Sequence, residues 1–194
     1  GLLTTNNLEI YQNIVKNRSH GISRDQSDFI DKSHGPWFYE QTSLGYNYRM
    51  TDIGAALGRS QLKKVEKFIS QRRQIVKFYN ENFTGIPIKT PSLYSKSQSS
   101  HHLYVVEVKS NSSDFTRAGL FNFLRENGIG VNVHYIPIHL QPYYKKIGFK
   151  KGDFPNSESY YEQALSLPIH PKLTIDDLDF IVSCTKKYFK RLGL

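Results

Sequence analysis

The sequence has a single cysteine and no long apolar run. Cys184 is the one Cys among 194 residues, so the chain cannot form an internal disulfide, which fits a reducing compartment. We expect Cys184 to be a small buried hydrophobe. No stretch reaches the about 18 apolar residues that a membrane-spanning helix needs, and residues 1–10 lack the basic and apolar regions of a signal peptide. We therefore expect a cytoplasmic protein without a membrane anchor.

The motifs of several enzyme classes are also missing. The sequence contains no G-x-G-x-x-G or P-loop pattern for a nucleotide, and no G-x-S-x-G elbow for a nucleophilic serine. Seven histidines invite a metal site, but His101 and His102 are adjacent and would point to opposite faces of a strand. No Cys or carboxylate cluster completes a ligand set with His134 and His139. We therefore predict no metal site.

Basic residues outnumber acidic ones. The net charge of +9 comes from 26 Lys and Arg against 17 Asp and Glu, which would suit a polyanionic partner such as nucleic acid. The basic residues are spread along the expected helices, however, and no zinc-finger, RNA-recognition or basic-zipper pattern occurs. We predict no nucleic-acid partner. We keep a basic nucleic-acid binder as the last of three hypotheses; the other two are given below. If it were correct, the affinity of the protein for DNA would fall steeply as the salt concentration rises.

Residues 51–83 form the longest helical pattern in the chain. Thr51 is a natural N-cap, and Asp52 places a negative charge at the positive end of the helix dipole. Apolar residues follow at helical spacing, so we predict one long helix. Gly54 and Gly58 in its first turns each cost about 1 kcal/mol relative to Ala, which is typical of close approach by another backbone or a ligand.

Shorter elements precede this helix. We expect a strand over residues 2–5, for which the chain offers no evident partner. A helix should follow, capped by Asn6 with Glu9 completing a capping box, and should end near Asn17. Residues 22–44 predict a long irregular loop whose single tryptophan either anchors the loop or lies near a site.

After residue 83, short strands alternate with helices and predict a small α+β domain. The expected elements are an edge strand near residues 86–91, a strand over 101–108, a helix capped within 111–114 and ending at Gly128, a strand over 130–138, a helix over 158–165, and a last helix capped by Thr174.

Two segments carry candidate binding residues. Asn47 and Arg49 lie just ahead of a helix N-terminus, a place that suits a phosphate, although the same segment could simply pack the helix entrance and form a turn. His134 and Tyr135 fall on the strand expected over 130–138 and would point oppositely. One of them could then face a ligand, or Tyr135 could be core and His134 a satisfied edge residue.

Several blocks of the sequence together resemble one family. Three blocks resemble the DegT/DnrJ/StrS sugar-nucleotide aminotransferases: GYNYRMTDIGAALGRSQLKK, RSHGISRD and GVNVHYIPIHLQPYYKKIGFKKGDFPNSESYYEQALSLPIHPKLT. A fourth block, GLLTTNN, resembles the strand after their lysine motif. The longest block is most similar to members that act on UDP-linked 4-keto-6-deoxy amino sugars in pseudaminic acid biosynthesis. The resemblance implies an α/β fold, the fold-type I pyridoxal-phosphate (PLP)-dependent transferase. Residues 1–50 would belong to its PLP-binding large domain, 51–83 to the interdomain helix and 84–194 to the small C-terminal α+β domain.

The same resemblance implies PLP as cofactor, a nucleotide sugar as substrate and a homodimer as the assembly. Asn47 matches the Asn that reaches the PLP phosphate of the other subunit. The residues that the resemblance places in the substrate pocket are Tyr46, Arg49, His134, Tyr135 and His139.

The residues for the chemistry itself have no match in this chain. Transamination with PLP needs a Lys for the Schiff base and an acid beside the pyridine nitrogen. In the family, both lie before the segment that Gly1 resembles, and no Lys here has a matching context, so we assign no catalytic residue. The first hypothesis is therefore the C-terminal portion of an aminotransferase with glutamate as donor. The second is a non-catalytic or split-gene partner subunit that needs a separate N-terminal half.

We predict that this chain alone forms no covalent adduct with PLP. Without the Schiff-base lysine, the absorption band at roughly 400 nm that reports a Lys–PLP bond should be missing. Absorbance after incubation with PLP, followed by borohydride reduction and mass spectrometry, measures this. A stable, borohydride-reducible adduct on the pure chain would contradict the prediction.

Overall fold

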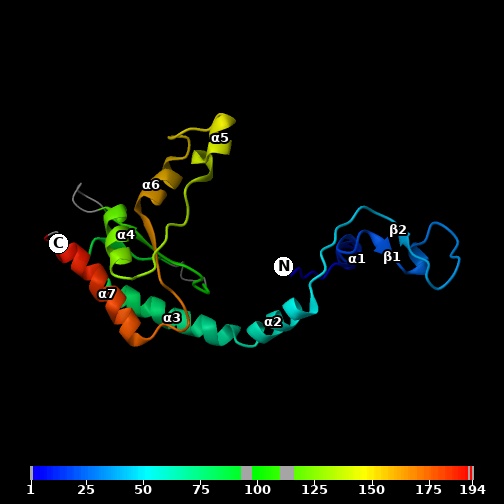
Figure 1. Ribbon diagram of the computed structural model, residues 1–194, viewed down its shortest axis with the longest axis horizontal. Coiled ribbons are helices and arrows are strands. Elements are labelled where there is room, and N and C mark those ends of the chain that lie inside the picture. Colours follow the sequence, from blue (N-terminus) through cyan, green and yellow to red (C-terminus); the bar gives the residue numbers. More distant parts are fainter. Residues whose placement is uncertain (1, 93–97, 110–115, 192, 194) are drawn as a thin grey trace. The chain divides into compact units, whose positions relative to one another are not determined.

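Figure 1 shows the computed structural model of the protein, which describes residues 2–92, 98–109, 116–191 and 193. The chain divides into two compact units, Gly1–Lys63 and Lys64–Leu194. Each unit has its own elements and is described by itself. No helix within the described ranges is both long enough and apolar enough to cross a membrane.

The first unit has little apolar core. Its elements are α1 (Leu8–Asn17), β1 (Ile22–Ser23), the 3-10 helix η1 (Gln26–Asp28), β2 (Glu40–Gln41) and α2 (Asp52–Leu62). β1 and β2 pair antiparallel, with Ile22 opposite Gln41, and so close the base of the loop predicted over 22–44. Among residues 2–63 no apolar side chain is buried. Backbone hydrogen bonds rather than apolar packing therefore organise this unit.

Residues 2–5, predicted as a strand, form no regular element. Leu2 is 91% exposed and Leu3 is 63% exposed. A strand exists only where a neighbouring backbone takes its N–H and C=O groups, and none of the segments that the structure describes pairs with residues 2–5. The β-forming side chains in this segment are a weak preference that needs a partner to take effect.

The cap of α1 lies one residue later than predicted. Asn7, not Asn6, is the N-cap, because its side-chain oxygen accepts the N–H of Ile10 at 3.0 Å. With the cap at this position, Glu9 is the second helical residue and cannot complete a capping box. The helix ends at Asn17, as predicted.

The helix predicted over residues 51–83 is two helices, α2 and α3 (Val65–Asn82). Thr51 caps α2 as predicted, since its hydroxyl accepts a backbone N–H of the first turn at 3.2 Å. Lys63 and Lys64 separate the helices, and neither is a Gly or Pro that would signal a break. The break coincides with the boundary between the units, and of the two helices only α3 buries apolar side chains.

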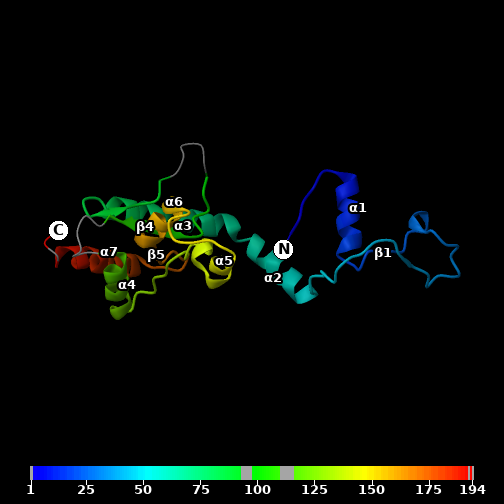
Figure 2. The same ribbon diagram turned by 90° about the horizontal axis from the view of Figure 1, so that it is seen from above.

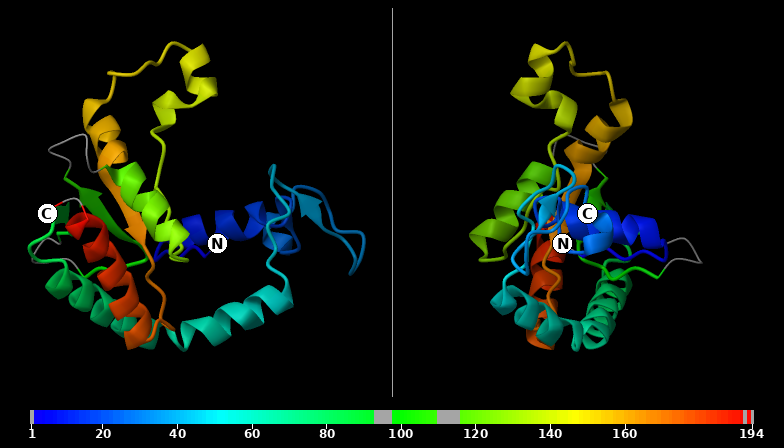
Figure 3. Two further views of the ribbon diagram at one scale, coloured as in Figure 1. Left: turned by 60° about the vertical axis from the view of Figure 1, so that its left-hand side comes forward. Right: turned by 90° about the vertical axis from the view of Figure 1, so that its right-hand side faces the viewer.

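The second unit is an antiparallel sheet packed against helices. Its elements after α3 are β3 (Ile88–Lys89), β4 (Tyr104–Val108), α4 (Arg117–Glu126), the 3-10 helix η2 (Ile138–Leu140), α5 (Pro142–Lys146), α6 (Pro155–Gln163), β5 (Ala164–Leu167) and α7 (Ile175–Lys190). The strand order is β3-β4-β5, and β3 lies at an edge as predicted. Figures 2 and 3 show α7 beside both α3 and α4. In Figure 3 the η2–α5 segment extends beyond the sheet.

The core lies between the sheet and α3, α4 and α7. Its largest fully buried side chains are Tyr79, Tyr104, Phe189, Leu120, Leu124 and Leu165. The two tyrosines satisfy their hydroxyls inside the core: Tyr79 donates to the carbonyl of Pro168 at 2.9 Å, and Tyr104 donates to Asn80 Oδ1 at 2.7 Å. Burial raises the pKa of both hydroxyls, so both remain neutral donors.

The third strand of the sheet is not the predicted one. Residues 130–138 form no strand, and a single bridge joins Asn132 to Ser166. The third strand is β5, whose first two residues fall within the range predicted as a helix over 158–165. The helix in this region is α6, which ends at Gln163. All four residues of β5 (Ala-Leu-Ser-Leu) are buried, and a short, mostly apolar run with two buried faces cannot be told from a helix by periodicity.

Other local predictions in this unit are confirmed. Gly128 has φ +77° and follows the C-cap of α4, and Thr174 caps α7 in a capping box with Asp177. Cys184 is buried. The cap predicted within residues 111–114 lies outside the described residues; Thr116 is the N-cap of α4 and accepts the N–H of Gly119 at 3.0 Å.

We predict that Leu120→Ala lowers the free energy of unfolding by roughly 2–5 kcal/mol, because Leu120 is fully buried and its truncation leaves a cavity. Denaturant unfolding followed by circular dichroism measures the change. The matched control is Leu103→Ala, which removes the same atoms from a side chain that is 37% exposed and should cost clearly less. Equal losses for the two variants would show that the core is not where the structure puts it.

Candidate functional site

The RSHG and GYNYR motifs of the first unit lie side by side. The carbonyl of Tyr46 accepts the backbone N–H of His20 at 2.9 Å. Ser19 and Asn47, near the centres of the two motifs, form an antiparallel bridge. The tertiary structure thus joins two motifs that are separate in sequence.

Two glycines allow this close approach. A Cβ on Gly45 would collide with the backbone of Gly21, and a Cβ on Gly21 would collide with the backbone of Ser43. Gly21 also has φ +69°, which a residue with a side chain rarely adopts. The glycines of the two motifs are therefore a requirement of their backbone contact.

Arg49 orients the side chain of Asn47. Arg49 Nε donates to Asn47 Oδ1 at 3.0 Å, and Arg49 Nη2 lies 3.5 Å from His20 Nε2. Because the amide oxygen of Asn47 is occupied, its two N–H donors remain for an external acceptor. The rings of Tyr46 and Tyr48 stack with centroids 4.7 Å apart and are exposed, so they do not pack the helix entrance as the alternative interpretation expected.

This arrangement suits a phosphate group. The motif leads directly into α2, whose first turn carries unsatisfied backbone N–H groups and the positive end of the helix dipole. Thr51 takes one of these N–H groups, and Asp52 offsets part of the positive potential. The amide of Asn47 and the guanidinium of Arg49 supply further donors, so the residues present fit the phosphate of PLP.

The first unit has three lysines: Lys63 is the C-cap of α2, and the other two are Lys16 and Lys32. Lys16 Nζ is 2.8 Å from Asp28 Oδ2, and Asp28 also accepts from the hydroxyl of Ser23 at 2.6 Å. Hydrogen bonds from Lys16 and then Ser23 lower the pKa of Asp28. Lys32 is exposed in the loop between η1 and β2. Nothing in these contacts gives either lysine the role of a Schiff-base lysine.

In the second unit, His134 is bound to the sheet and Tyr135 is exposed. His134 Nδ1 and Ser166 Oγ are 2.7 Å apart, and the peptide bond between His134 and Tyr135 is cis. Tyr135 is 72% exposed, so the alternative in which it belongs to the core is wrong. The prediction that the two side chains point oppositely is wrong, because the residues are not on a strand and their rings meet edge to face with centroids 4.6 Å apart.

His139 is buried in a pair with Glu158. His139 Nε2 donates to Glu158 Oε1 at 2.8 Å, and the same oxygen accepts the N–H of Gly152 at 2.7 Å. The ring of His139 lies 4.8 Å from that of Phe154, at the edge of a mainly apolar cavity of about 320 Å³. Sequence reasoning missed Glu158, because an acid in the first turn of a helix is typical of a dipole interaction.

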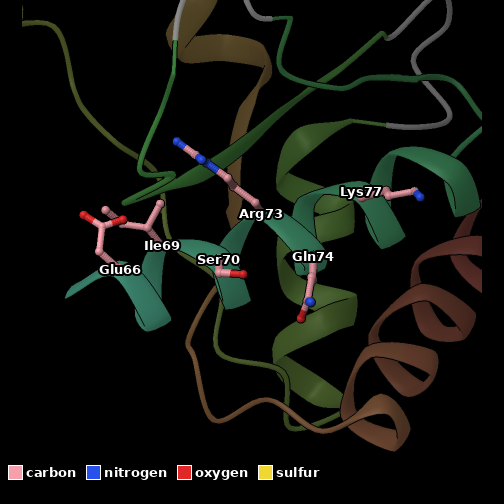
Figure 4. Close-up of a pocket in the computed structure, with 6 residues that line it drawn as sticks. All are labelled: Glu66, Ile69, Ser70, Arg73, Gln74 and Lys77. Atoms are coloured by element: carbon pink, nitrogen blue, oxygen red, sulfur yellow. The ribbon is translucent and has the colours of Figure 1, made fainter. Parts of the chain in front are cut away.

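A second cavity of about 310 Å³ lies along α3. Figure 4 shows its side chains on one helix face, with Arg73 extending away to donate from Nε to the carbonyl of Ser99 at 3.2 Å. Burial, and then the charge of Arg73, lower the pKa of the nearby His101. None of the predicted site residues lines this cavity. Within the described ranges, no three His, Cys, Asp or Glu side chains gather as metal ligands would.

The predicted site residues thus form two groups, one in each unit. Tyr46, Asn47 and Arg49 come together with His20 in the first unit. His134, Tyr135 and His139 lie on one short segment of the second unit. Within each group, the residues lie close together in the structure or in the sequence.

Solved structures that match this chain include sugar aminotransferases, one of them solved in a PLP form. Helicobacter pylori PseC, an aminotransferase involved in the biosynthesis of pseudoaminic acid, matches with a TM-score of 0.81 at 28% identity over 96% of this chain and 48% of its own. The family model described as DegT/DnrJ/EryC1/StrS aminotransferase matches residues 1–186. The chain belongs to this family.

Curated relatives show the same likeness. The spore coat polysaccharide biosynthesis protein SpsC of Bacillus subtilis is 37% identical over 98% of this chain and 49% of its own. UDP-4-amino-4,6-dideoxy-N-acetyl-beta-L-altrosamine transaminase of Campylobacter jejuni is 32% identical over 93% of this chain and 46% of its own. The chain spans about half the length of the curated relatives it matches. The family, together with a matching structure solved in a PLP form, identifies PLP as the cofactor.

We predict that Glu158→Gln makes the stability of the folded state less dependent on pH in the acidic range. Hydrogen bonds from His139 and then from the N–H of Gly152 hold the pKa of the Glu158 carboxyl below its ordinary value of 4.5. A lowered pKa stabilises the folded state fully above the ordinary value, and this contribution is lost as the pH falls through the folded-state pKa. The difference in melting temperature between wild type and variant should therefore be largest above pH 4.5 and shrink below it.

Thermal unfolding followed by circular dichroism, from about pH 7 to about pH 3, measures this difference. Glu162→Gln is the matched control, since Glu162 is exposed on the same helix and makes only a 3.8 Å contact with Lys151. A melting-temperature difference for Glu158→Gln that does not change with pH would contradict the prediction.

Proposed function

We propose that this chain is the C-terminal portion of an aminotransferase that moves an amino group from glutamate to a nucleotide-linked 4-keto-6-deoxy sugar. The family match over residues 1–186 supports the reaction class. The sugar is proposed to be of the pseudaminic acid type, which the likeness to the altrosamine transaminase and to PseC supports.

The observation that carries the proposal is the orientation of Asn47. Arg49 Nε donates to the side-chain oxygen of Asn47 at 3.0 Å. The side-chain N–H groups of Asn47 therefore remain as donors just ahead of the start of α2. Asn47, with Arg49 and the first turn of α2, would hold the phosphate of PLP, which supplies the electron sink for transamination. We propose that Asn47 does so for the other subunit of a homodimer.

The second unit would contribute to the sugar site. Tyr135 is the most exposed of its proposed residues; one side of its ring meets the ring of His134, with centroids 4.6 Å apart, and the exposed remainder with its hydroxyl can contact a substrate. His134 and His139 flank the same segment, and we propose that they bind the substrate; Tyr46 and Arg49 are likewise proposed as substrate-binding residues. Each of these residues binds or orients; none carries the covalent chemistry.

The reaction also needs a Schiff-base lysine, which we place outside the 194 residues of this chain. It would lie on a further segment, either of the same polypeptide or of a separate subunit, as in the split-gene alternative. The enzyme in which this chain and the lysine-bearing segment are both present is called the assembled enzyme below.

We predict that Asn47→Ala raises the Kd of the assembled enzyme for PLP about tenfold or more, because it removes the phosphate donors. Absorbance titration with PLP measures the Kd. Asn13→Ala, an exposed Asn of α1 in the same unit, is the matched control and should leave the Kd unchanged.

Amino transfer is measured in the same preparation from a UDP-linked 4-keto-6-deoxy sugar and glutamate, as the amino sugar and 2-oxoglutarate formed. No transfer by the wild-type assembled enzyme with a panel of such sugars would overturn the proposed reaction. Unchanged PLP affinity in Asn47→Ala would overturn the role of Asn47 alone.

A further inference from the structure

The segment from His134 to His139 is held at both of its ends. At one end, His134 Nδ1 lies 2.7 Å from Ser166 Oγ on β5. At the other, His139 Nε2 donates to Glu158 Oε1 on α6 at 2.8 Å. Ser166 and Glu158 are both buried, so neither bond competes freely with water.

Of the four residues between these two ends, Pro137 is buried and the other three are apolar and exposed. Tyr135 is 72%, Ile136 49% and Ile138 66% exposed. A segment with exposed apolar side chains would normally bury them against the protein or be mobile, because water offers these side chains no favourable contacts. Here the two histidine bonds fix its ends, and Pro137 restricts the backbone between them.

Both anchoring residues are themselves fixed by second contacts. The backbone of Ser166 donates to the carbonyl of Asn132 at 2.8 Å and accepts the N–H of Asn132 at 3.2 Å. Ser166 also lies in β5, which pairs with β4 along its whole length. Glu158 accepts from Gly152 at 2.7 Å and so ties the turn before α6 to the same carboxylate. The anchors therefore transmit the rigidity of the sheet and of α6 to the segment.

We propose that Ser166 and Glu158 are positioning residues of the sugar site. Through His134 and His139 they hold residues 135–138 in place, so that Tyr135 meets the substrate in a prearranged conformation. This inference rests on the proposed function, in which Tyr135 contacts the nucleotide sugar. Prearrangement strengthens binding because the entropy of ordering the segment has been lost before the substrate arrives.

The first test is steady-state kinetics of the assembled enzyme with Ser166→Ala and Glu158→Gln. Each variant should raise the KM for the nucleotide sugar about three- to tenfold while kcat and the PLP Kd stay within about twofold, as expected when binding rather than chemistry is impaired. The matched controls are Ser159→Ala and Glu162→Gln, exposed residues of α6 that should leave KM unchanged.

A double-mutant cycle tests whether Glu158 acts through His139. If both residues serve one bond, the double variant Glu158→Gln with His139→Gln should raise KM no more than the more severe single variant. If the KM of the double variant rises by the product of the two single increases, Glu158 does not act through His139, and the proposed coupling is overturned. Ser166→Ala removes a single hydroxyl, so it tests the other end of the segment should Glu158→Gln fail to fold.

Amide hydrogen exchange separates this inference from the proposed function, because it needs no substrate. The N–H groups of Leu140 and Gly152 are hydrogen-bonded at 2.9 Å and 2.7 Å, and both should exchange faster in Glu158→Gln than in the wild type or Glu162→Gln. Unchanged exchange would overturn the anchoring. Faster exchange with an unchanged KM would overturn the positioning role while the proposed function stands. A wild-type enzyme with no transfer activity would overturn the proposed function and the positioning role together, whereas the exchange data would still report on the anchoring.

Discussion

The pairing of β4 with β5 is the contact on which the second unit depends. Alternation along β5 sends Leu165 and Leu167 into the core opposite buried residues of β4, and sends Ser166 to the other face of the sheet. There Ser166 meets His134. A slip of one residue in this register would move the two leucines out of the core to the opposite face of the sheet and withdraw Ser166 from His134 at the same time. Core packing and one of the two anchors of the segment 134–139 therefore depend on the same strand pair.

The first unit is organised by a different kind of force. No apolar side chain among residues 2–63 is buried, and the contact between the RSHG and GYNYR motifs is made by the backbone at Gly21 and Gly45. Because the backbone makes the contact, the side chains of Asn47 and Arg49 are free to present donors. This is a suitable way to build a phosphate site, since donors consumed by packing could not bind the anion.

The sequence indicated the residues of the candidate site but not their hydrogen-bond partners. The motifs indicated Asn47, Arg49, His134 and His139, and the structure places hydrogen bonds on all four. Ser166 and Glu158, separated from their histidines by 32 and 19 residues, left no local signal. An acid at the start of a helix and a serine in an apolar run each have a commoner local explanation.

The sequence by itself determined the features that depend on neighbouring residues. Thr51 and Thr174 cap their helices and Gly128 follows α4, because a cap or a left-handed residue needs only the adjacent backbone. The motifs likewise indicated the family that the comparisons show. Only the tertiary structure decided that β5 rather than residues 130–138 is the third strand, and that the helix over 51–83 breaks at Lys63. Strand pairing is settled by contacts between distant segments, which local preference does not contain.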